Sequence, residues 1–324
     1  MPPEPSQPPS DIQHAAPPTL NHLIGQRAVV SQVKVALEAA YADNSRVCHM
    51  LMTGAPGLGK TLLAQIVAKE MAADFNEVLG QSLAQPSDLF GLLLQATDKS
   101  VVFVDESDEL PAQIQTTLYR AVEERKLFLP QSSSASGAKS IPLADFTLLL
   151  ASNHEHSLVQ PLRDRMKLIL RFEQYSEAEL CELVHQRARA LHWDVANDVF
   201  PMIAARGRGT PRLALRLLEA CRRTCRSELG VTVSRRHFNR TCELEGIDGL
   251  GLDRQEIQLL RILQDAGAAV RLNVLASRLG LPPRTVSDVV ERHLVQLGLI
   301  DKSSDGRRIT AKGLSHLRGD DDAE

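Results

Sequence analysis

The segment GAPGLGKT, residues 54–61, constrains the fold of this chain more than any other part of the sequence. It has the spacing G-x-x-x-x-G-K-T, follows the apolar run CHMLMT and precedes the helical pattern TLLAQIVAKEM. A glycine-rich loop between a buried strand and a helix is typical of a phosphate-binding loop. The segment therefore predicts an α/β fold around a parallel sheet, with a nucleotide bound at the end of a strand.

The residues of this phosphate-binding loop have distinct expected tasks. Gly54, Gly57 and Gly59 have no side chain, so the backbone can approach a phosphate closely. Lys60 would neutralise the β- and γ-phosphates of ATP, and Thr61 would offer its hydroxyl to Mg²⁺. The alternative is a chance match of the spacing, which the flanking strand and helix disfavour. The expected phosphate site comprises Gly54, Ala55, Pro56, Gly57, Leu58, Gly59, Lys60, Thr61 and Leu62.

Two further apolar runs end in polar side chains that would complete such a site. VVFVDES at 101–107 ends in Asp105 and Glu106, and FTLLLASN at 146–153 ends in Asn153. Carboxyl ends of parallel strands meet at one edge of a sheet, so we expect these side chains beside the loop. Asp105 would hold Mg²⁺ through water, Glu106 would orient or deprotonate the attacking water, and Asn153 would hold that water. The alternatives are an acidic helix cap and a turn-forming asparagine.

The composition excludes several classes of protein. Hydrophobic residues make up 43% and charged residues 24%, as in an ordinary soluble domain, and the net charge of −3 means that DNA binding needs a local basic patch. No apolar run reaches membrane-spanning length, and the N-terminus MPPEPSQPPS lacks the features of a signal peptide. We therefore expect a cytoplasmic protein without membrane contact. Its five cysteines have no regular spacing, and Cys221 and Cys225 are expected to be buried thiols rather than metal ligands.

Changes of pattern divide the chain into segments. The N-terminus is rich in proline and serine and is expected to be disordered. Strand and helix patterns then alternate, helical patterns alone follow, and GIDGLGL at 246–252 has the composition of a linker. The expected divisions are a Pro-rich N-terminus at 1–19, a nucleotide-binding core at 20–175, a helical segment at 176–247, a C-terminal domain at 252–316 and an acidic tail at 317–324.

The C-terminal domain has the pattern of a winged helix-turn-helix. Its helical patterns RQEIQLLRILQDAG, RLNVLASRLGL and PPRTVSDVVERHLVQLGLI precede DKSSDGRRITAKGL, which predicts a strand, a tight turn and a strand. Ten Lys and Arg against seven Asp and Glu over 253–316 make the domain locally basic. Arg284, Arg307 and Arg308 are expected to contact DNA phosphates. The alternative is a protein-binding module, a role that winged helices also have.

The order of these motifs resembles the AAA+ ATPases, and residues 20–316 are similar to the RuvB family of bacterial Holliday-junction branch-migration motors. The resemblance implies a P-loop core, a helical lid over 176–247 and a C-terminal winged helix. It is carried by LIGQ at 23–26, GAPGLGKTLLAQIVAKEM at 54–71, FTLLLASNHEHSLVQPLRDRM at 146–166 and ARGRGTPRLALRLL at 205–218.

The resemblance also implies residue roles. Arg165, the second arginine of PLRDR, stands where the family has an arginine finger that acts on the nucleotide of a neighbouring subunit. Arg212 in GTPR falls at the sensor-2 position, where it would touch the γ-phosphate from the lid. For Arg163 we expect an acidic partner or a packing role at the subunit interface. The implied contacts around the nucleoside are Ile24, Gly25, Tyr175 and Pro211.

For function, the resemblance implies a Mg²⁺-dependent ATPase that couples hydrolysis to DNA translocation as a helicase-like ring, expected to be a homo-hexamer. Its substrate would be duplex DNA or a four-way junction, and its process branch migration in recombination and repair. It also leaves room for a RuvA-like partner. The glutamate beside Asp105 agrees with hydrolysis, since it would act on water.

Departures from the family pattern indicate a diverged relative. SDEL at 107–110 replaces the family's usual IHRL, Asn153 replaces a threonine, AP at 16–17 replaces Arg-Pro, and Leu23 replaces an aromatic residue. The segment 125–146 stands where the family has the β-hairpin that docks RuvA, but its centre is rich in serine and glycine. These differences keep an alternative open: a non-motor, ATP-dependent DNA-binding switch or regulator.

Overall fold

The computed structural model describes residue 12 and residues 15–128 and 140–319 of the chain. It divides into two compact units, the first ending at Glu219 and the second beginning at Ala220. The boundary lies inside helix α8, which spans Pro211–Ser227. The expected disorder of the N-terminus, the Ser/Gly-rich centre of the segment 125–146 and the end of the acidic tail fall wholly or partly outside the described residues.

A five-stranded parallel sheet forms the centre of the first unit, as the alternating pattern predicted. Its strands lie in the order β2, β3, β6, β1, β7, so the strands that end at Asp105 and Asn153 are neighbours of each other and of β1. The strands are β1 (Met50–Thr53), β2 (Phe75–Leu79), β3 (Val101–Asp105), β6 (Thr147–Ser152) and β7 (Leu168–Arg171).

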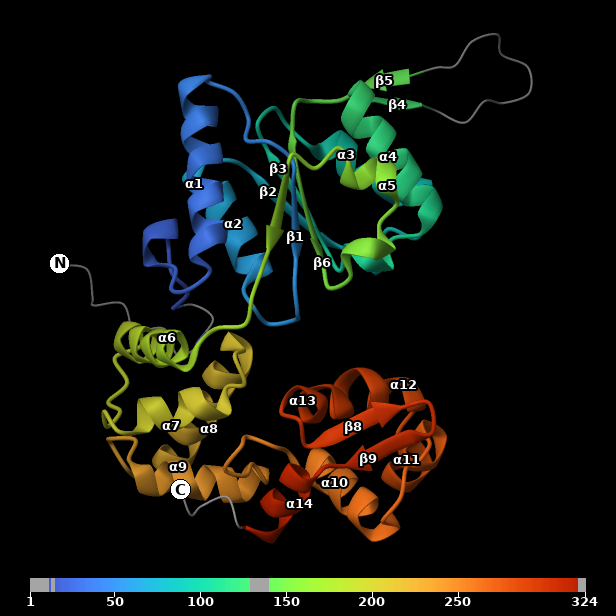
Figure 1. Ribbon diagram of the computed structural model, residues 1–324. Coiled ribbons are helices and arrows are strands. Elements are labelled where there is room, and N and C mark those ends of the chain that lie inside the picture. The colour runs from blue at the N-terminus through green and yellow to red at the C-terminus, as the bar shows by residue number, and fades with distance from the viewer. Residues whose placement is uncertain (1–11, 13–14, 129–139, 320–324) are drawn as a thin grey trace, which may run out of the picture. The chain divides into compact units, whose positions relative to one another are not determined.

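The central strands are continuous apolar runs because both faces of the sheet are covered. β1 and β6 are buried at every position, and β3 is buried up to Val104. Figure 1 shows α1 and α2 on one side of the sheet and α3, α4 and α5 on the other. Leu89, Ile114 and Leu162 from those three helices join the core on the second side. The sheet is therefore a packed platform whose carboxyl edge presents the polar strand ends.

The helices of the first unit begin and end close to the patterns in the sequence. α2 starts at Lys60, directly after Gly59, which has the left-handed φ of +101° that glycine adopts without strain. The α-helices are α1 (Arg27–Ala42), α2 (Lys60–Glu70), α3 (Pro86–Gln95), α4 (Ala112–Glu124), α5 (Gln160–Arg163), α6 (Glu177–Ala190) and α7 (Val199–Arg206), and the 3-10 turns are η1 (Leu20–His22), η2 (Gly80–Ser82), η3 (Ser107–Glu109) and η4 (Glu155–Ser157).

The segment 125–146 contains a two-stranded antiparallel hairpin. Strand β4 (Lys126–Phe128) pairs with β5 (Ser140–Pro142). The residues between them, 129–139, lie outside the part of the chain that the structure describes.

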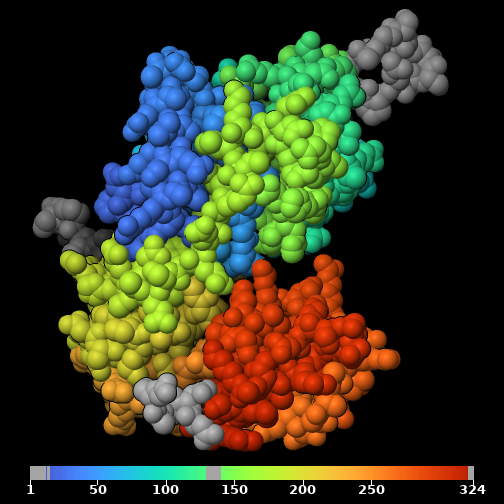
Figure 2. Space-filling view, viewed as in Figure 1, coloured from blue at the N-terminus to red at the C-terminus, as the bar shows by residue number. Residues whose placement is uncertain are grey.

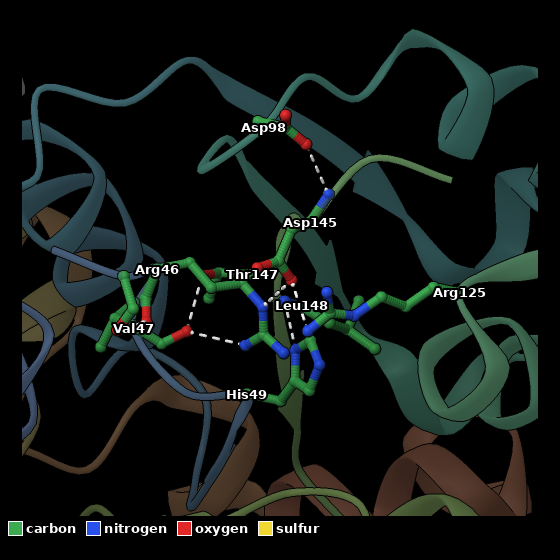
Figure 3. Close-up of polar contacts among 9 residues, drawn as sticks. Arg46, Val47, His49, Asp98, Arg125, Asp145, Thr147 and Leu148 are labelled. Carbon is green, nitrogen blue, oxygen red and sulfur yellow. Dashed lines mark hydrogen bonds and ion pairs between the residues drawn. The ribbon is translucent and has the colours of Figure 1, made fainter. Parts of the chain in front are cut away.

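The base of this hairpin is tied to the amino-terminal edge of the sheet through Asp145. Its Oδ1 accepts a hydrogen bond from Arg46 Nε at 2.6 Å and forms an ion pair with Arg125 Nη2 at 3.0 Å (Figure 3). Its backbone N–H donates to Asp98 Oδ1 at 2.8 Å. These contacts join residues that precede β1, β3 and β6 to both arms of the hairpin.

The second unit contains the end of α8, helix α9 and the winged helix, whose side chains fill the orange and red surface in Figure 2. Leu259, Leu275, Leu294 and Ile300 lie in its core, so the three predicted helices and the wing pack on one another. The elements are α9 (Arg235–Glu245), α10 (Arg254–Ala266), α11 (Leu272–Leu279), α12 (Pro283–Thr285), the π-helix η5 (Val286–Val290), α13 (Glu291–Gln296), β8 (Ile300–Ser303), β9 (Gly306–Ile309) and α14 (Ala311–Arg318).

The second unit differs from the sequence prediction in two places. The run ITAKGL was expected to finish the second strand of the wing, but β9 ends at Ile309 and α14 begins at Ala311. Thr310 starts this helix, because its side chain accepts a hydrogen bond from the N–H of Gly313. The third predicted helix is interrupted by the π-helical turn between α12 and α13.

Two predictions from composition can be compared with the described residues. Cys221 and Cys225 are both buried, as expected of core thiols, and burial raises the pKa of Cys221 to about 12. Over the described ranges, none of the helices has the length and apolar character needed to cross a lipid bilayer.

Candidate nucleotide-binding site

A cavity of about 570 Å³ opens at the carboxyl edge of the sheet in the first unit. Its walls come from the phosphate-binding loop, the ends of β3 and β6, the segment before α1, helix α6 and the start of α8. Every residue predicted for catalysis or nucleotide binding lines it except Gly25, Gly54, Ala55 and Arg165. The fold thus brings together residues that are far apart in the sequence, as the motif analysis expected.

Lys60 lies at the centre of the phosphate end of this cavity. Its Nζ donates to the carbonyl oxygens of Gly54 at 2.7 Å and Ala55 at 3.0 Å, and to Asn153 Oδ1 at 3.0 Å. Burial lowers the pKa of Lys60 below its usual range, while the carboxylate of Asp105 acts in the opposite direction. The ammonium group of Lys60 therefore bridges the residues that follow β1 and β6, and it places a positive charge where a phosphate would bind.

Thr61 and Asp105 form the second contact between strand ends. Thr61 Oγ1 donates to Asp105 Oδ2 at 2.6 Å, and the other oxygen of that carboxylate accepts the backbone N–H of Glu106 at 2.9 Å. A hydroxyl and a carboxylate are the hard oxygen ligands that Mg²⁺ takes beside nucleotide phosphates. The two side chains expected to bind the ion are thus adjacent, and their chemistry fits it.

Glu106 has an unusual backbone conformation. Its φ is +51°, which is left-handed and costly for a residue with a side chain. A Cβ on Gly80 would lie 2.3 Å from the carbonyl oxygen of Glu106, so only glycine fits beside this turn. The close packing fixes the turn that presents the exposed Glu106 side chain to the cavity. This is the placement expected of a residue that acts on water.

Asp108 is a residue of the site that the motif analysis noted only as a departure from the family pattern. Its Oδ1 accepts the backbone N–H of Asn153 at 3.2 Å, and its charge also counteracts the lowering of the Lys60 pKa. The neighbouring Ser107 donates from Oγ to the carbonyl oxygen of Ala151 at 2.9 Å. The SDEL segment therefore fastens the end of β3 to the end of β6 and positions Asn153.

Apolar side chains also line the cavity, and Tyr175 is one of them. A Cβ on Gly25 would lie 2.5 Å from Tyr175 Cε1, so Gly25 supports this ring from outside the cavity. Tyr175 Oη donates to the carbonyl oxygen of Leu58 at 3.4 Å, and burial raises the pKa of its hydroxyl to about 12. Tyr175 therefore stays neutral and packs between the phosphate-binding loop and the segment LIGQ at 23–26.

The start of α8 lies directly against the phosphate-binding loop. The backbone N–H of Arg212 donates to the carbonyl oxygen of Gly57 at 3.4 Å, and a Cβ on Gly57 would lie 2.9 Å from Arg212 Cβ. Pro211 and Arg212 both line the cavity. The charge of Arg212 also contributes, after burial, to lowering the pKa of Lys60.

Within a single chain, the two arginines of PLRDR have different partners. Arg165 Nη2 pairs with Glu123 Oε1 at 2.5 Å, and this hydrogen bond raises the pKa of Arg165. The side chain of Arg163 hydrogen-bonds to Gln160 and His156 and has no acidic partner among the described residues, so of its two expected roles only packing at a subunit interface stays a prediction. The ion pair belongs to Arg165, which lies outside the nucleotide cavity of its own chain.

The basic residues of the winged helix divide into exposed and buried. The side chain of Arg284 is 89% exposed, with Asp288 Oδ2 at 3.4 Å, and Arg308 is exposed on β9. Arg307 is buried, and its Nε and Nη2 donate to Glu291 at 2.7 and 2.8 Å. The prediction that Arg307 contacts DNA phosphates is therefore wrong, because adjacent strand residues face opposite sides and this one faces the core.

Several cavity residues were not among those predicted for the site from the sequence. Ala16 and Pro17 come from the segment before η1, and Leu183, Arg187 and Leu215 come from helices α6 and α8. The spacing of Leu183 and Arg187, four residues apart, places them on one helical face, but nothing local indicates that this face meets a nucleotide cavity.

Three family models match successive parts of the chain. The model of the Holliday junction DNA helicase RuvB P-loop domain matches residues 15–172, and that of the RuvB AAA lid domain matches 175–248. The model of the RuvB C-terminal winged helix domain matches 249–318.

Whole-chain similarities agree with these matches. A Holliday junction branch migration complex subunit RuvB from Ehrlichia ruminantium is 34% identical over 303 residues, which are 93% of this chain and 91% of the relative. The Kosmotoga olearia protein of that name is 34% identical over 305 residues, or 93% and 89% of the two chains. The solved Thermotoga maritima RuvB Holliday junction branch migration motor is 31% identical, with a TM-score of 0.81 over 94% of this chain and 98% of its own.

Proposed function

Because this chain belongs to the RuvB family of AAA+ ATPases, we propose that it hydrolyses ATP and uses the reaction to move DNA through a branched junction. The observation that carries the proposal is the pair of hydrogen bonds that join Lys60 to Asn153 and Thr61 to Asp105. Relatives at about a third identity are named as subunits of a Holliday junction branch migration complex.

In the proposed reaction, the phosphates of ATP occupy the polar end of the cavity. Lys60 exchanges its contacts with the loop carbonyls for phosphate oxygens, because a cation gains more from them than from neutral acceptors. Glu106 accepts a proton from the attacking water or orients it, and Asn153 holds that water from the neighbouring strand. Arg212, on the first turn of α8, stabilises the charge that develops on the γ-phosphate.

Mg²⁺ is the proposed cofactor, and it would neutralise phosphate charge and orient the β- and γ-phosphates. Thr61 would contribute its hydroxyl as a ligand, and Asp105 would bind through water. Their 2.6 Å hydrogen bond supports the assignment, since both oxygens already point to one place. The carboxylate of Asp105 also accepts the backbone N–H of Glu106. The proposed Mg²⁺ ligand therefore helps to position the residue proposed to activate water.

The proposed active assembly is a ring, expected to be a hexamer of this chain. Arg165 supports this, because it lies outside the nucleotide cavity of its own chain and its cation is available to a neighbour once Glu123 is displaced. In that assembly Arg165 would act in trans on the γ-phosphate of the next subunit. A RuvA-like partner, docking on the hairpin of β4 and β5, is part of the proposal.

The proposed DNA-binding surface is on the winged helix and uses Arg284 and Arg308, whose exposed cations suit phosphate oxygens. The substrate is a four-way junction or duplex DNA, within recombination and repair. A cytoplasmic location follows from that substrate.

The test of this function combines ATP turnover with DNA branch migration. We expect a four-way junction to stimulate ATP hydrolysis and the protein to convert the junction to two duplexes. Lys60→Ala should abolish both activities by removing the cation from the phosphate end. Lys69→Ala is the matched control, since Lys69 is exposed on the same helix.

Two other results would change the proposal. ATP hydrolysis without conversion of the junction would contradict the proposed motor activity and leave the protein as a DNA-dependent ATPase. ATP binding without turnover would favour the alternative of a DNA-binding switch, and the altered SDEL segment at the end of β3 would then be the first place to look for the cause.

A further inference from the structure

Arg187 is a buried arginine that lines the nucleotide cavity and has no acidic partner among the described residues. Only 5% of its surface is exposed. Its Nη1 donates to the carbonyl oxygen of Ile12 at 3.2 Å, and its Nε is buried without a hydrogen-bond partner within the described part of the chain. The guanidinium thus has donors to spare inside a cavity.

An uncompensated buried arginine is costly for a protein. Burial lowers the pKa of Arg187, yet an arginine keeps its charge in proteins, so the penalty of removing the cation from water stays. The guanidinium has five N–H donors and no acceptor. A donor set of this kind, facing a cavity, is satisfied only by a molecule that brings acceptors into that cavity.

The position of Arg187 identifies which end of the nucleotide it meets. Leu183, one helical turn earlier on α6, lines the same cavity. The adjacent Gln186 donates from Nε2 to the carbonyl oxygen of His22 at 2.8 Å, which holds α6 against the segment before α1. Lys60 and Arg212 belong to the loop and to α8, at the phosphate end. Arg187 comes from α6 and contacts Ile12, whereas the phosphate-binding groups come from the loop and from α8, so we place Arg187 beside the nucleoside when the phosphates occupy the loop.

We infer that Arg187 donates hydrogen bonds to the nucleoside of the bound nucleotide, at a ring nitrogen of the purine or a ribose oxygen, and so sets the affinity for that part of the ligand. The inference rests on the proposed binding of ATP and deepens it. Arg187 is on this account a specificity-determining residue, which touches the ligand but takes no part in phosphate chemistry.

The first test compares Arg187→Met with Arg189→Met in full-length protein. Arg189 is exposed on the same helix and is the matched control. By calorimetry with Mg-ATP, we expect Arg187→Met to weaken binding about ten-fold or more, as for the loss of a charged hydrogen bond. Arg189→Met should bind like the wild type. Equal affinity of Arg187→Met and wild type would overturn the inference.

The second test identifies the acceptor with 1-deaza-, 3-deaza-, 7-deaza- and 2′-deoxy-ATP. If Arg187 contacts one of the altered atoms, that analogue binds the wild type more weakly than ATP does. On Arg187→Met the same analogue loses nothing further, because the contact is already absent. A role in folding alone would not produce this non-additivity. Equal losses for every analogue on both proteins would overturn the inference.

Melting without nucleotide separates a structural role from a ligand role. Methionine has nearly the length of arginine and no charge to bury, so Arg187→Met should melt at or above the wild-type temperature. A lower melting temperature with unchanged ATP affinity would show that Arg187 only caps Ile12. A wild type that does not bind Mg-ATP would instead overturn the proposed function, and the inference with it.

Discussion

At the scale of single residues, Asp108 links the acidic turn after β3 to the proposed water-binding asparagine. Its carboxylate accepts the backbone N–H of Asn153 and lies near enough to Lys60 to affect its pKa. We expect Asp108→Ala to lower kcat for ATP hydrolysis about ten-fold, because Asn153 loses the group that positions it. The KM for ATP should change much less, since the phosphate contacts of the loop are intact. Steady-state kinetics measure both.

The control for this prediction is Glu109→Ala. Glu109 is exposed on the same 3-10 turn, and it is absent from the cavity. The role given to Asp108 would be wrong if kcat were unchanged, or if the two substitutions lowered it equally.

His49 gives the first unit a dependence on pH. It is buried, its Nδ1 accepts the N–H of Leu148 at 2.8 Å, and burial lowers its pKa from 6.5 to about 3 (Figure 3). The unfolded chain therefore binds a proton at a higher pH than the folded one. The stability contributed by neutral His49 is complete above about pH 6.5 and falls by up to about 1.4 kcal/mol per pH unit as the pH decreases toward about 3.

Urea unfolding between pH 7 and pH 5 measures this effect. His49→Asn keeps an acceptor near Leu148 but has no proton to gain in this range. We expect the variant to have a shallower dependence of unfolding free energy on pH than the wild type. Identical slopes would assign the pH dependence to other groups.

Sequence motifs could identify those site residues that lie at the end of a strand or in the phosphate-binding loop. Lys60, Thr61 and Asp105 belong to this class, and their side chains meet as the motifs predicted. Arg187 does not belong to this class. Its burial depends on how helix α6, which is distant from the loop in the sequence, packs on the segment before α1. Periodicity gives the face of a helix but not the partner of that face.

At the scale of elements, the wing of the C-terminal domain is held to α13 by a buried ion pair. Burial opposes ionisation of Glu291, but hydrogen bonds from Arg307 and Lys302 outweigh it and hold its pKa below the usual range. Glu291 and Arg307 side chains are 2% and 10% exposed. Glu291→Gln should destabilise the second unit by about 3 kcal/mol, because it leaves a buried cation without its counter-ion. Chemical denaturation provides the measurement.

Substitutions of the two adjacent arginines of β9 should have opposite consequences. Arg307→Met removes a buried cation from Glu291 and should lower stability, while Arg308→Met should leave stability unchanged. In DNA-binding titrations, Arg308→Met should reduce the slope of log K against log salt by about one, as expected for a lost phosphate contact. If Arg307→Met lowered that slope while the fold remained stable, the structural role assigned to Arg307 would be contradicted.

The elements differ in how far sequence could predict them. β1, β3 and β6 are almost uninterrupted apolar runs. Such runs are expected of strands covered on both faces, so these strands and the parallel sheet could be predicted together from the sequence. The end of β9 was missed because the capping of α14 is a single hydrogen bond between Thr310 and Gly313, which leaves no hydrophobic pattern in the sequence. The π-helical turn in η5 was missed because a change from 3.6-residue spacing over one turn is too short to alter the periodicity.

At the scale of the whole molecule, the proposed trans role of Arg165 would make activity a property of the assembly. We expect Arg165→Ala and Lys60→Ala each to lack ATPase activity when tested alone. A mixture should regain part of it, since some interfaces then combine an intact loop with an intact Arg165 from the neighbour. ATP turnover after mixing and reassembly measures this.

The same mixture also tests the opposite assignment. If Arg165 acted within its own chain, every active site in the mixture would lack one group and no activity would return. Arg163→Ala is a useful comparison, since the side-chain hydrogen bonds of Arg163 among the described residues go to Gln160 and His156 and not to Glu123.

The network around Asp145 has a mechanical consequence. Arg46 precedes β1 and Asp145 precedes β6, while Lys60 and Asn153 follow the same two strands. The hairpin base and the nucleotide site thus lie at opposite ends of the hydrogen-bonded strands β1 and β6, which are about 13 and about 20 Å long at about 3.3 Å per residue. A force applied to the hairpin would therefore be transmitted to Lys60 and Asn153 along the strand axis. Extended backbone is stiffest in that direction.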